Sequence, residues 1–342
     1  MDVLGKRVSI VMCTYNGERH LREQLDSVLN QTYGLHEIII QDDGSTDGTM
    51  AIVEEYAARN SIIKPCVNKG GRGVNANFFS AMALATGDYI AICDQDDIWE
   101  PDKIRLQMEA IGGKLLCTCR SVPFSNDSGI SLNYDRRCPN YGLFRLLFSS
   151  LPGHTLLFSS LPGHTLLFRR ELLNLFPHKG EIFNRTYYDV ILSITAAAYD
   201  SIVMVDRELV HQRRCATSDT YIVPDKRRER SAANGAYILW WAVCNYGRMK
   251  KYIAWHFRPR LDFLRAIKSD SRVCRDGVRL LECECSGGLL PLLRMVRLFV
   301  KYRHTLFYTY EPDPVALLRS LLYPLMQAYN YRYLLERGQP LD

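Results

Sequence analysis

Two apolar, β-branched runs that each end in a cluster of acidic residues constrain the fold most strongly. Residues 37–40 read Glu-Ile-Ile-Ile and lead into Gln-Asp-Asp-Gly-Ser, and residues 88–93 read Asp-Tyr-Ile-Ala-Ile-Cys and lead into Asp-Gln-Asp-Asp. Runs of this kind are typical of strands that a parallel sheet buries on both faces. Ligands of such sheets bind at the carboxyl ends of the strands. We therefore expect both acidic loops to lie at one edge of a sheet and to form a site there.

A third strand is predicted at the start of the chain. Residues 7–13 form another apolar run, which ends in the polar sequence Thr14-Tyr15-Asn16-Gly17-Glu18. Residues 18–30 and 46–58 carry apolar side chains at helical spacing. The first hundred residues are therefore predicted to alternate between strands and helices, which is the pattern of an α/β domain with a mostly parallel sheet.

Carboxylates gathered at a sheet edge are costly unless a positive group joins them. Hard oxygen ligands suit Mg²⁺ and Mn²⁺, so a divalent cation that carries a phosphorylated substrate is the expected partner. A structural alternative stays open, because Asp42-Asp43-Gly44-Ser45 also suits an Asx-turn and a helix cap. Thr14 and Asn16 could likewise be simple turn residues.

Four segments together resemble the family 2 glycosyltransferases. They are TYNGE at 14–18, IIIQDDGSTDGT at 38–49, ATGDYIAICDQDDIWEPDKI at 85–104 and GHTLLFRREL at 163–172. The similarity covers about residues 7–215, and CDQDDIW at 93–99 is typical of the bacterial rhamnosyltransferase-like branch. The resemblance implies the GT-A fold, a nucleotide-diphosphate sugar donor, a divalent metal (Mg²⁺ or Mn²⁺) and inversion at the anomeric carbon.

The same resemblance implies a set of donor and metal contacts. Asp96 would bind the metal, and Asp94 would hold the metal shell or the ribose, whereas Asp97 is expected to support them or to cap a helix. Asp43 would contact the base or ribose of the nucleotide. Asn77 has a core hydrogen bond as its alternative role. The donor-binding residues expected in this way are Thr14, Tyr15, Asn16, Glu18, Asp43, Asn77, Asp94 and Arg213.

The catalytic base and the acceptor site are expected further along the chain. Asp189 begins an apolar helix in Tyr-Tyr-Asp-Val-Ile-Leu and is the expected base that deprotonates the acceptor hydroxyl, with a helix N-cap as the alternative. Gly163-His164-Thr165 is expected to line the acceptor pocket, although a buried structural histidine is an equal reading of His164. Cys215 stands where family members often have a histidine, which puts diphosphate contact from this loop in doubt.

A perfect tandem repeat interrupts this region. The sequence FSSLPGHTLL occupies residues 148–157 and again residues 158–167. Ten residues are too few for a solenoid unit, so the repeat indicates an in-frame duplication. Only the second copy runs into Phe-Arg-Arg-Glu-Leu, as the family pattern requires, so we expect the second copy to hold the native position.

Charge divides the chain into two predicted parts. Residues 211–342 hold 23 Lys and Arg against 12 Asp and Glu, whereas the first 210 residues hold 20 against 25. We predict a GT-A domain over residues 1–215, with a donor half at about 7–110 and an acceptor half at about 111–215. A basic helical region would follow over residues 216–342. Its apolar stripes would either pack on the catalytic domain or contact an anionic membrane surface, and its charge could also be a solvated face.

The remaining expectations concern partners and location. The acceptor would be a saccharide or a lipid-linked saccharide, and the 93–99 motif favours deoxythymidine-diphosphate rhamnose as donor in surface-polysaccharide synthesis. No nucleic-acid motif is present, so nucleic acid is not an expected partner. Scattered cysteines and the absence of a signal peptide predict a cytoplasmic protein, and no run of about 20 apolar residues predicts a transmembrane helix. Peripheral contact with the inner membrane face stays open as one alternative for the basic region. A non-catalytic nucleotide-sugar binder and a nucleotidyltransferase remain the alternative functions.

Overall fold

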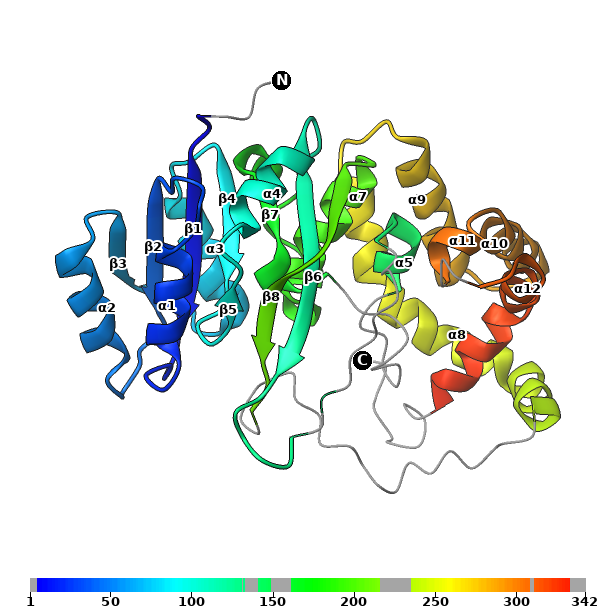
Figure 1. The fold of residues 1–342 in the computed structure, drawn as a ribbon. Coiled ribbons are helices and arrows are strands. Elements are labelled where there is room, and N and C mark those ends of the chain that lie inside the picture. Colours follow the sequence, from blue (N-terminus) through cyan, green and yellow to red (C-terminus); the bar gives the residue numbers. More distant parts are fainter. Residues whose placement is uncertain are drawn as a thin grey trace.

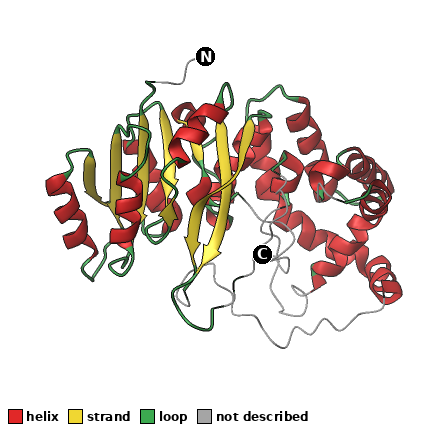
Figure 2. Cartoon of the chain, in the orientation of Figure 1, coloured by secondary structure: helices red, strands yellow, loops and turns green. Residues whose placement is uncertain are grey.

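An eight-stranded sheet with helices on both faces occupies one half of the molecule, and a cluster of helices occupies the other (Figures 1 and 2). The computed structural model describes residues 5–130, 132, 141–148, 161–215, 235–307 and 311–332. The strands are β1 Val8–Thr14, β2 Glu37–Asp42, β3 Ile63–Val67, β4 Tyr89–Cys93, β5 Ile98–Trp99, β6 Leu116–Phe124, β7 Leu167–Arg169 and β8 Ile202–Arg213. Their spatial order is β3-β2-β1-β4-β7-β6-β8-β5.

Helices fill the connections of the first half and make up the second. Those of the sheet half are α1 Leu21–Leu29, α2 Thr49–Arg59, α3 Val74–Leu84, α4 Lys103–Ile111, α5 Leu143–Leu147, α6 Ile182–Arg185 and α7 Tyr188–Ala198. Those that follow are α8 Gly235–Ala266, α9 Arg272–Cys285, α10 Leu289–Lys301, α11 Arg303–Leu306 and α12 Asp313–Asn330. The short 3-10 segments η1 and η2 cover Gly163–Thr165 and Arg170–Asn174.

The predicted α/β class and the alternation of the first hundred residues are confirmed. β1 pairs in parallel with β2 and β4, and β2 pairs in parallel with β3. β7 then runs antiparallel to both of its neighbours, β4 and β6. The parallel strands therefore end at one common edge, and their following loops meet there, as the sequence indicated.

The sheet is buried on both faces, which is why its strands are apolar almost throughout. Ile10 and Met12 of β1 face one core, where they join side chains of α1, α2 and α4. Val11 points to the opposite face and joins a second core that includes α3 and α7. Strict alternation of side chains along a strand divides neighbouring apolar residues between the two cores in this way.

The predicted helical C-terminal region is also confirmed, and it shares the second of these cores. Phe148, directly after α5, lies with its ring centroid 5.0 Å from that of Phe257 in α8 and 5.8 Å from that of Phe299 in α10. Ile191 of α7 is buried in the same cluster. One side of these helices therefore packs on the sheet half of the protein, which was one of the alternatives expected for their apolar stripes. The boundary at residue 215 stays a prediction, because residues 216–234 lie outside the described part of the chain.

Among the described helices, none combines the length and the apolar composition that crossing a membrane would require.

Candidate active site

Three polar loops meet at the carboxyl edge of the parallel strands. The loop after β1 is tied to the loop after β4, because the Tyr15 amide donates to Gln95 Oε1 over 2.9 Å and Gln95 Nε2 donates to the Tyr15 carbonyl over 3.0 Å. The loop after β1 is also tied to the loop after β2, since the Asn16 amide donates to Ser45 Oγ over 2.8 Å. The structure thus brings together the segments that carry most of the predicted donor and metal residues.

Asp42 and Asp43 play different structural parts. Asp42 is buried, and its carboxylate accepts hydrogen bonds from the Gly44 and Ser45 amides, at 2.9 and 2.7 Å, and from Thr14 Oγ1 at 2.9 Å. Asp42 is therefore the Asx-turn residue of this loop. Asp43 instead accepts from Asn68 Nδ2 and from the Gly73 amide, both at 2.8 Å.

The carboxylate of Asp43 consequently holds the loop between β3 and α3 against the sheet edge. Its contact with a nucleotide stays a prediction.

The other predicted donor residues also make contacts within the protein. Asn16 adopts a left-handed φ of 47°, and its Oδ1 accepts from the Thr46 amide over 2.9 Å. Glu18 accepts from the Gly48 amide over 2.8 Å at the start of α2. Asn77 is buried and pairs with Gln41, so the structure realises the core hydrogen bond that was its alternative role. Tyr15 is exposed beside these groups.

A compact cluster of Asp94, Asp97 and His164 lies in the loop after β4 and in η1. One ligand atom from each residue lies within 4.8 Å of the others. His164 Nδ1 is 3.1 Å from Asp94 Oδ2 and 3.1 Å from Asp97 Oδ2. His164 and Asp97 are fully enclosed, whereas 37% of the Asp94 side chain is exposed. Asp94 is therefore the member of the cluster that solvent or a ligand can reach.

Burial dominates the electrostatics of this loop. Burial raises the pKa of Asp97 to about 7, although the nearby His164 opposes the shift. Burial, with the neighbouring charge of Asp94, raises the pKa of Asp96 to about 6. For His164, burial favours the neutral ring, but Asp97 and Asp94 outweigh it and raise the pKa. Burial and the neighbouring charge of Asp94 thus favour the protonated forms of Asp96 and Asp97, and a bound cation would favour their ionised forms.

Several polar atoms at this point are left without partners. His164 Nε2 and Arg213 Nη1 are buried and find no hydrogen-bond partner among the described residues. Asp97 Oδ2 is near His164 Nδ1 but lacks hydrogen-bond geometry. Unsatisfied buried polar groups are rare in native proteins, so a bound ligand, ion or water is expected to satisfy these atoms.

Arg213, at the end of β8, forms hydrogen bonds that hold the acidic loop after β4. Its amide donates to Asp97 Oδ1 over 3.0 Å, and its Nε donates to the Asp96 carbonyl over 2.8 Å. Its guanidinium also forms an ion pair with Glu23 of α1 and lies 4.5 Å from the ring centroid of Phe124. These contacts position the loop, and direct phosphate contact by Arg213 stays a prediction.

Asp189 lies in the first turn of α7, near the cluster. The N-cap of this helix is Tyr187, so the cap alternative for Asp189 does not describe its position. Its Oδ1 accepts from the Val190 amide over 2.8 Å. Desolvation raises the pKa of Asp189 to about 7, and the charge of Asp94 adds to this rise while the Val190 bond opposes it. A carboxylate with such a pKa can accept a proton near neutral pH.

Asn75 of α3 fixes the start of α7, and sequence reasoning missed it. Its Oδ1 accepts from the Tyr188 amide over 2.8 Å, while its Nδ2 donates to the carbonyls of Thr186 and Phe183, at 2.7 and 3.0 Å. Because Asp189 is the next residue, Asn75 sets the position of its carboxylate. No local pattern could have revealed this, since the partners lie more than 100 residues apart.

The segment Gly163–Thr165 carries His164 of the cluster and packs around it. A Cβ on Gly163 would lie 2.1 Å from the Tyr188 hydroxyl, so only glycine fits at this position. Thr165 Oγ1 lies 2.8 Å from Thr118 Oγ1, and the Thr165 carbonyl accepts from Gln107 over 2.8 Å. All three residues of the segment are buried, and their contact with an acceptor stays a prediction. Of the first repeat copy, residues 149–157 lie outside the described residues.

The metal prediction is changed in one respect by this geometry. The sequence pointed to Asp96 and Asp94, whereas the cluster contains Asp94, Asp97 and His164. Asp96 therefore stays a predicted ligand without a place in the cluster. Asp97, which was expected to support the metal residues or to cap a helix, is instead a member of the cluster.

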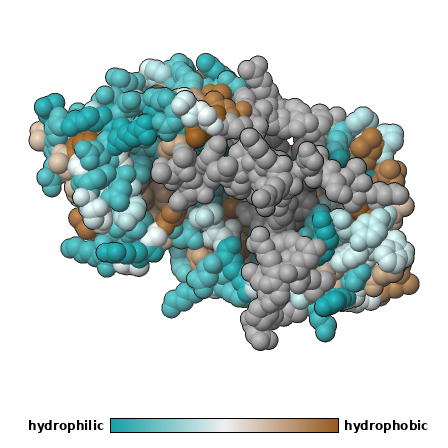
Figure 3. Space-filling view, turned by 90° about the horizontal axis from the view of Figure 1, so that it is seen from below, coloured by the Kyte–Doolittle hydropathy of each residue, from teal (hydrophilic) through white to brown (hydrophobic). Residues whose placement is uncertain are grey.

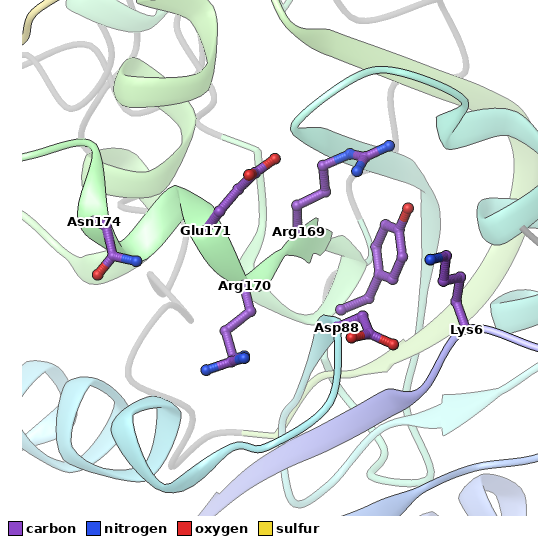
Figure 4. A pocket seen from close by; sticks show the side chains of 7 residues that line it. Lys6, Asp88, Arg169, Arg170, Glu171 and Asn174 are labelled. Atoms are coloured by element: carbon purple, nitrogen blue, oxygen red, sulfur yellow. The ribbon is translucent and has the colours of Figure 1, made fainter. Parts of the chain in front are cut away.

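A cavity of about 320 Å³ lies at the opposite edge of the sheet, near the start of β4 (Figure 4). Arg169 and Arg170 point in different directions from its wall in Figure 4. Arg169 donates to the backbone carbonyls of Gly112 and Lys114, and Arg170 donates to that of Gly87. These arginines are thus engaged in holding the backbone. The cavity is separate from the acidic edge.

Comparison with known proteins agrees with this arrangement. Residues 9–176 match the sequence profile of the glycosyl transferase family 2. WfgD of Escherichia coli, named as a UDP-Glc:alpha-D-GlcNAc-diphosphoundecaprenol beta-1,3-glucosyltransferase, is 38% identical over 101 residues, which are 30% of this chain and 39% of that protein. An uncharacterized glycosyltransferase of Nostoc sp., alr2836, is 35% identical over 104 residues, which are 30% of this chain and 32% of that protein. The chain thus spans about a third of the length of these relatives.

Among solved structures, residues 1–349 of S. aureus TarS in complex with UDP-GlcNAc superpose with a TM-score of 0.52 at 15% identity, over 97% of this chain and 92% of that one. At this identity the likeness shows the fold, and it confirms the expected GT-A architecture. The fold, the acidic edge and the match over residues 9–176 agree: the chain carries a glycosyl transferase family 2 domain.

Proposed function

We propose that this protein is an inverting, metal-dependent glycosyltransferase that moves a sugar from a nucleotide-diphosphate donor to a saccharide or lipid-linked acceptor. The observation that carries the proposal is the excess of carboxylates at the carboxyl edge of the family 2 domain. Burial raises the pKa of Asp96, Asp97 and Asp189 there, to between about 6 and about 7. An edge of this kind favours a cation and offers a proton acceptor.

The residues present fit a divalent metal. Asp94, Asp97 and His164 offer oxygen and nitrogen ligands, and buried polar atoms of the site lack partners. Asp94 belongs both to this cluster and to the set predicted from sequence, so we place Mg²⁺ or Mn²⁺ on Asp94. When bound, the metal would offset the negative charge that develops on the leaving nucleotide diphosphate. A substitution series decides whether Asp96 or Asp97 is the second carboxylate ligand.

The loops after β1 and β2 are the proposed donor-binding surface. Tyr15 is exposed, and its amide is bound to Gln95 in the loop that carries Asp94 and Asp97; Asn16 and Asp43 stand in the adjoining turns. Their hydrogen bonds hold the three loops in one arrangement before any ligand arrives. Preorganisation of this kind reduces the entropy that is lost on binding.

Asp189 is the proposed base. Its pKa of about 7 suits proton acceptance from the acceptor hydroxyl at neutral pH. Asn75 and the start of α7 hold the carboxylate in place, and Asp94 is close enough to raise its pKa. For inversion, the acceptor hydroxyl attacks the anomeric carbon from the face opposite the departing diphosphate, so the donor sugar would lie between Asp189 and the metal-bound diphosphate.

The finer assignments rest on likeness alone. WfgD is named for an acceptor with a diphosphoundecaprenol group, which supports a lipid-linked acceptor for this chain. The CDQDDIW motif at 93–99 supports rhamnose as the donor sugar. Both fit surface-polysaccharide synthesis at the cytoplasmic face of the membrane.

The test is a transfer assay on the full chain with a panel of nucleotide sugars and Mn²⁺, read as release of nucleoside diphosphate. Asp96→Ala should abolish transfer, and Asp96→Asn should lower it by at least about 10²-fold, as removal of one preorganised charge-stabilising group does. Asp97→Asn is measured beside it to identify the second ligand, and Glu109→Gln, at an exposed position of α4, serves as the matched control. Full activity after chelation would contradict the metal assignment, and release of pyrophosphate from a nucleoside triphosphate would indicate a nucleotidyltransferase.

A further inference from the structure

Helices α10 and α12 carry several large apolar side chains that are exposed in the described part of the chain. We call this set the leucine face; it consists of Leu289, Leu290 and Leu293 of α10 and Val315, Leu317, Leu318, Leu321 and Met326 of α12. Leu289 is 71% exposed and Leu318 is 58% exposed. The two helices pack against each other, and Ser320 of α12 donates to the Phe299 carbonyl of α10. Figure 3 shows apolar residues at the surface of the helical half of the molecule.

The leucine face is not the side by which these helices hold the fold. Met295 and Phe299 of α10 and Ala316 and Ala328 of α12 are fully buried and join the helices to the protein. The exposed residues are additional to this core. Exposed apolar side chains gathered on two helices that pack together indicate a surface for binding another body.

Positive charge accompanies the leucine face. Arg294, Arg297 and Lys301 lie on the exposed part of α10, which contains no Asp or Glu. Arg294 and Arg297 form no ion pair with any residue in the described ranges. The only acid of α12, Asp313, is paired with Arg303 and His304. The face therefore combines bare leucines with unneutralised arginines.

We propose that the leucine face docks on an anionic lipid surface, with the leucines at the boundary between headgroups and acyl chains and the arginines at the phosphates. Basic helices with one apolar side bind lipid surfaces in this manner. A second copy of the chain fits less well. A twofold interface applies the same patch to itself, so it would set the α10 arginines near their own counterparts without carboxylates to neutralise them.

The proposal concerns binding and does not depend on which sugar or acceptor the enzyme uses. The test is flotation of the full chain with vesicles of equimolar phosphatidylglycerol and phosphatidylcholine, compared with vesicles of phosphatidylcholine alone. Leu318→Asp combined with Leu321→Asp should lower partitioning onto the anionic vesicles by at least about tenfold, because two apolar anchors are replaced by charges. Arg294→Gln and Arg297→Gln should each lower it about fivefold, and added salt should have the same effect.

The matched control is Leu84→Asp, which changes an equally exposed leucine at the end of α3, on the sheet half of the protein. It should bind as the unchanged protein does. Thermal unfolding and retained transfer in solution establish that the variants are folded, and sedimentation velocity measures their oligomeric state. Failure to float with anionic vesicles, or equal flotation of the Leu318/Leu321 variant, would overturn the proposal. A dimer that the same variant dissociates would also overturn it, since a second copy would then cover the face.

Discussion

Replacing Asp189 by Asn gives the sharpest test of the proposed base, because activity and stability should move in opposite directions. The change keeps the shape of the side chain but removes its capacity to accept a proton, so transfer should fall by about 10²- to 10⁴-fold. Donor affinity should hardly change, because Asp189 stands at the start of α7 and outside the three donor loops. Below pH 7, transfer by the unchanged enzyme should fall as Asp189 becomes protonated, given its pKa of about 7.

The stability effect follows from the same pKa. Asp189 titrates at about 7 in the folded chain against an ordinary 3.8. A shift of one pKa unit corresponds to about 1.36 kcal/mol. Ionising this carboxyl in the folded, metal-free protein therefore costs on the order of 4 kcal/mol at most. Between pH 4 and pH 7 the unfolded chain holds fewer protons at this position than the folded chain does. The free energy of unfolding therefore falls as pH rises through that window and stays lowered above it.

The Asp189→Asn variant has no carboxyl to ionise at this position, so it does not lose this stability as pH rises. The difference in free energy of unfolding between the variant and the unchanged protein should therefore increase from pH 4 to pH 8. Denaturant unfolding in the presence of a chelator measures the effect, and Glu54→Gln, at an exposed position of α2, is the control without such a trend. If the variant is less stable at every pH, the Asp189 carboxylate has a structural role instead. Turnover that survives, with donor affinity lost, would move Asp189 to the nucleotide site.

Three further outcomes are expected. Asn75→Ala should lower kcat by about tenfold or more with little change in donor affinity, because its hydrogen bonds all go to the segment before Asp189; an unchanged kcat would remove its positioning role. Deleting residues 148–157 should preserve the fold and keep or raise activity, since the second repeat copy brings an identical Phe next to Leu147; a deletion that unfolds the chain in circular dichroism would contradict this. His164→Ala should reduce transfer more than His154→Ala, because His164 contacts Asp94 and Asp97; the reverse order in one assay would show that the first copy holds the site.

Carboxylates of the acidic edge combine a structural role with a predicted ligand-binding role. Asp43 and Glu18 hold neighbouring loops by accepting backbone amides, and the same carboxylates were predicted to contact the donor. A carboxylate with two oxygens can do both, since each oxygen accepts more than one hydrogen bond. The contacts within the protein thus set the geometry of the edge without excluding the donor from it.

The sequence by itself determined the parallel α/β half and the edge at which its polar loops gather. The apolar runs ending at Asp42 and Cys93 are local patterns, and parallel strands must place their carboxyl ends together. It also indicated basic helices after residue 215, because helical spacing is likewise local.

The tertiary structure alone decided which groups meet at that edge. His164 joins Asp94 and Asp97 across about 70 residues of sequence, and Asn75 reaches the start of α7 across more than 100. It also decided which side of α10 and α12 is buried, since Leu293 and Phe299 are equally apolar in sequence yet one is exposed and the other enclosed. The physical reason is that burial and pKa depend on distant chain segments brought together by folding, and no local pattern encodes those distances.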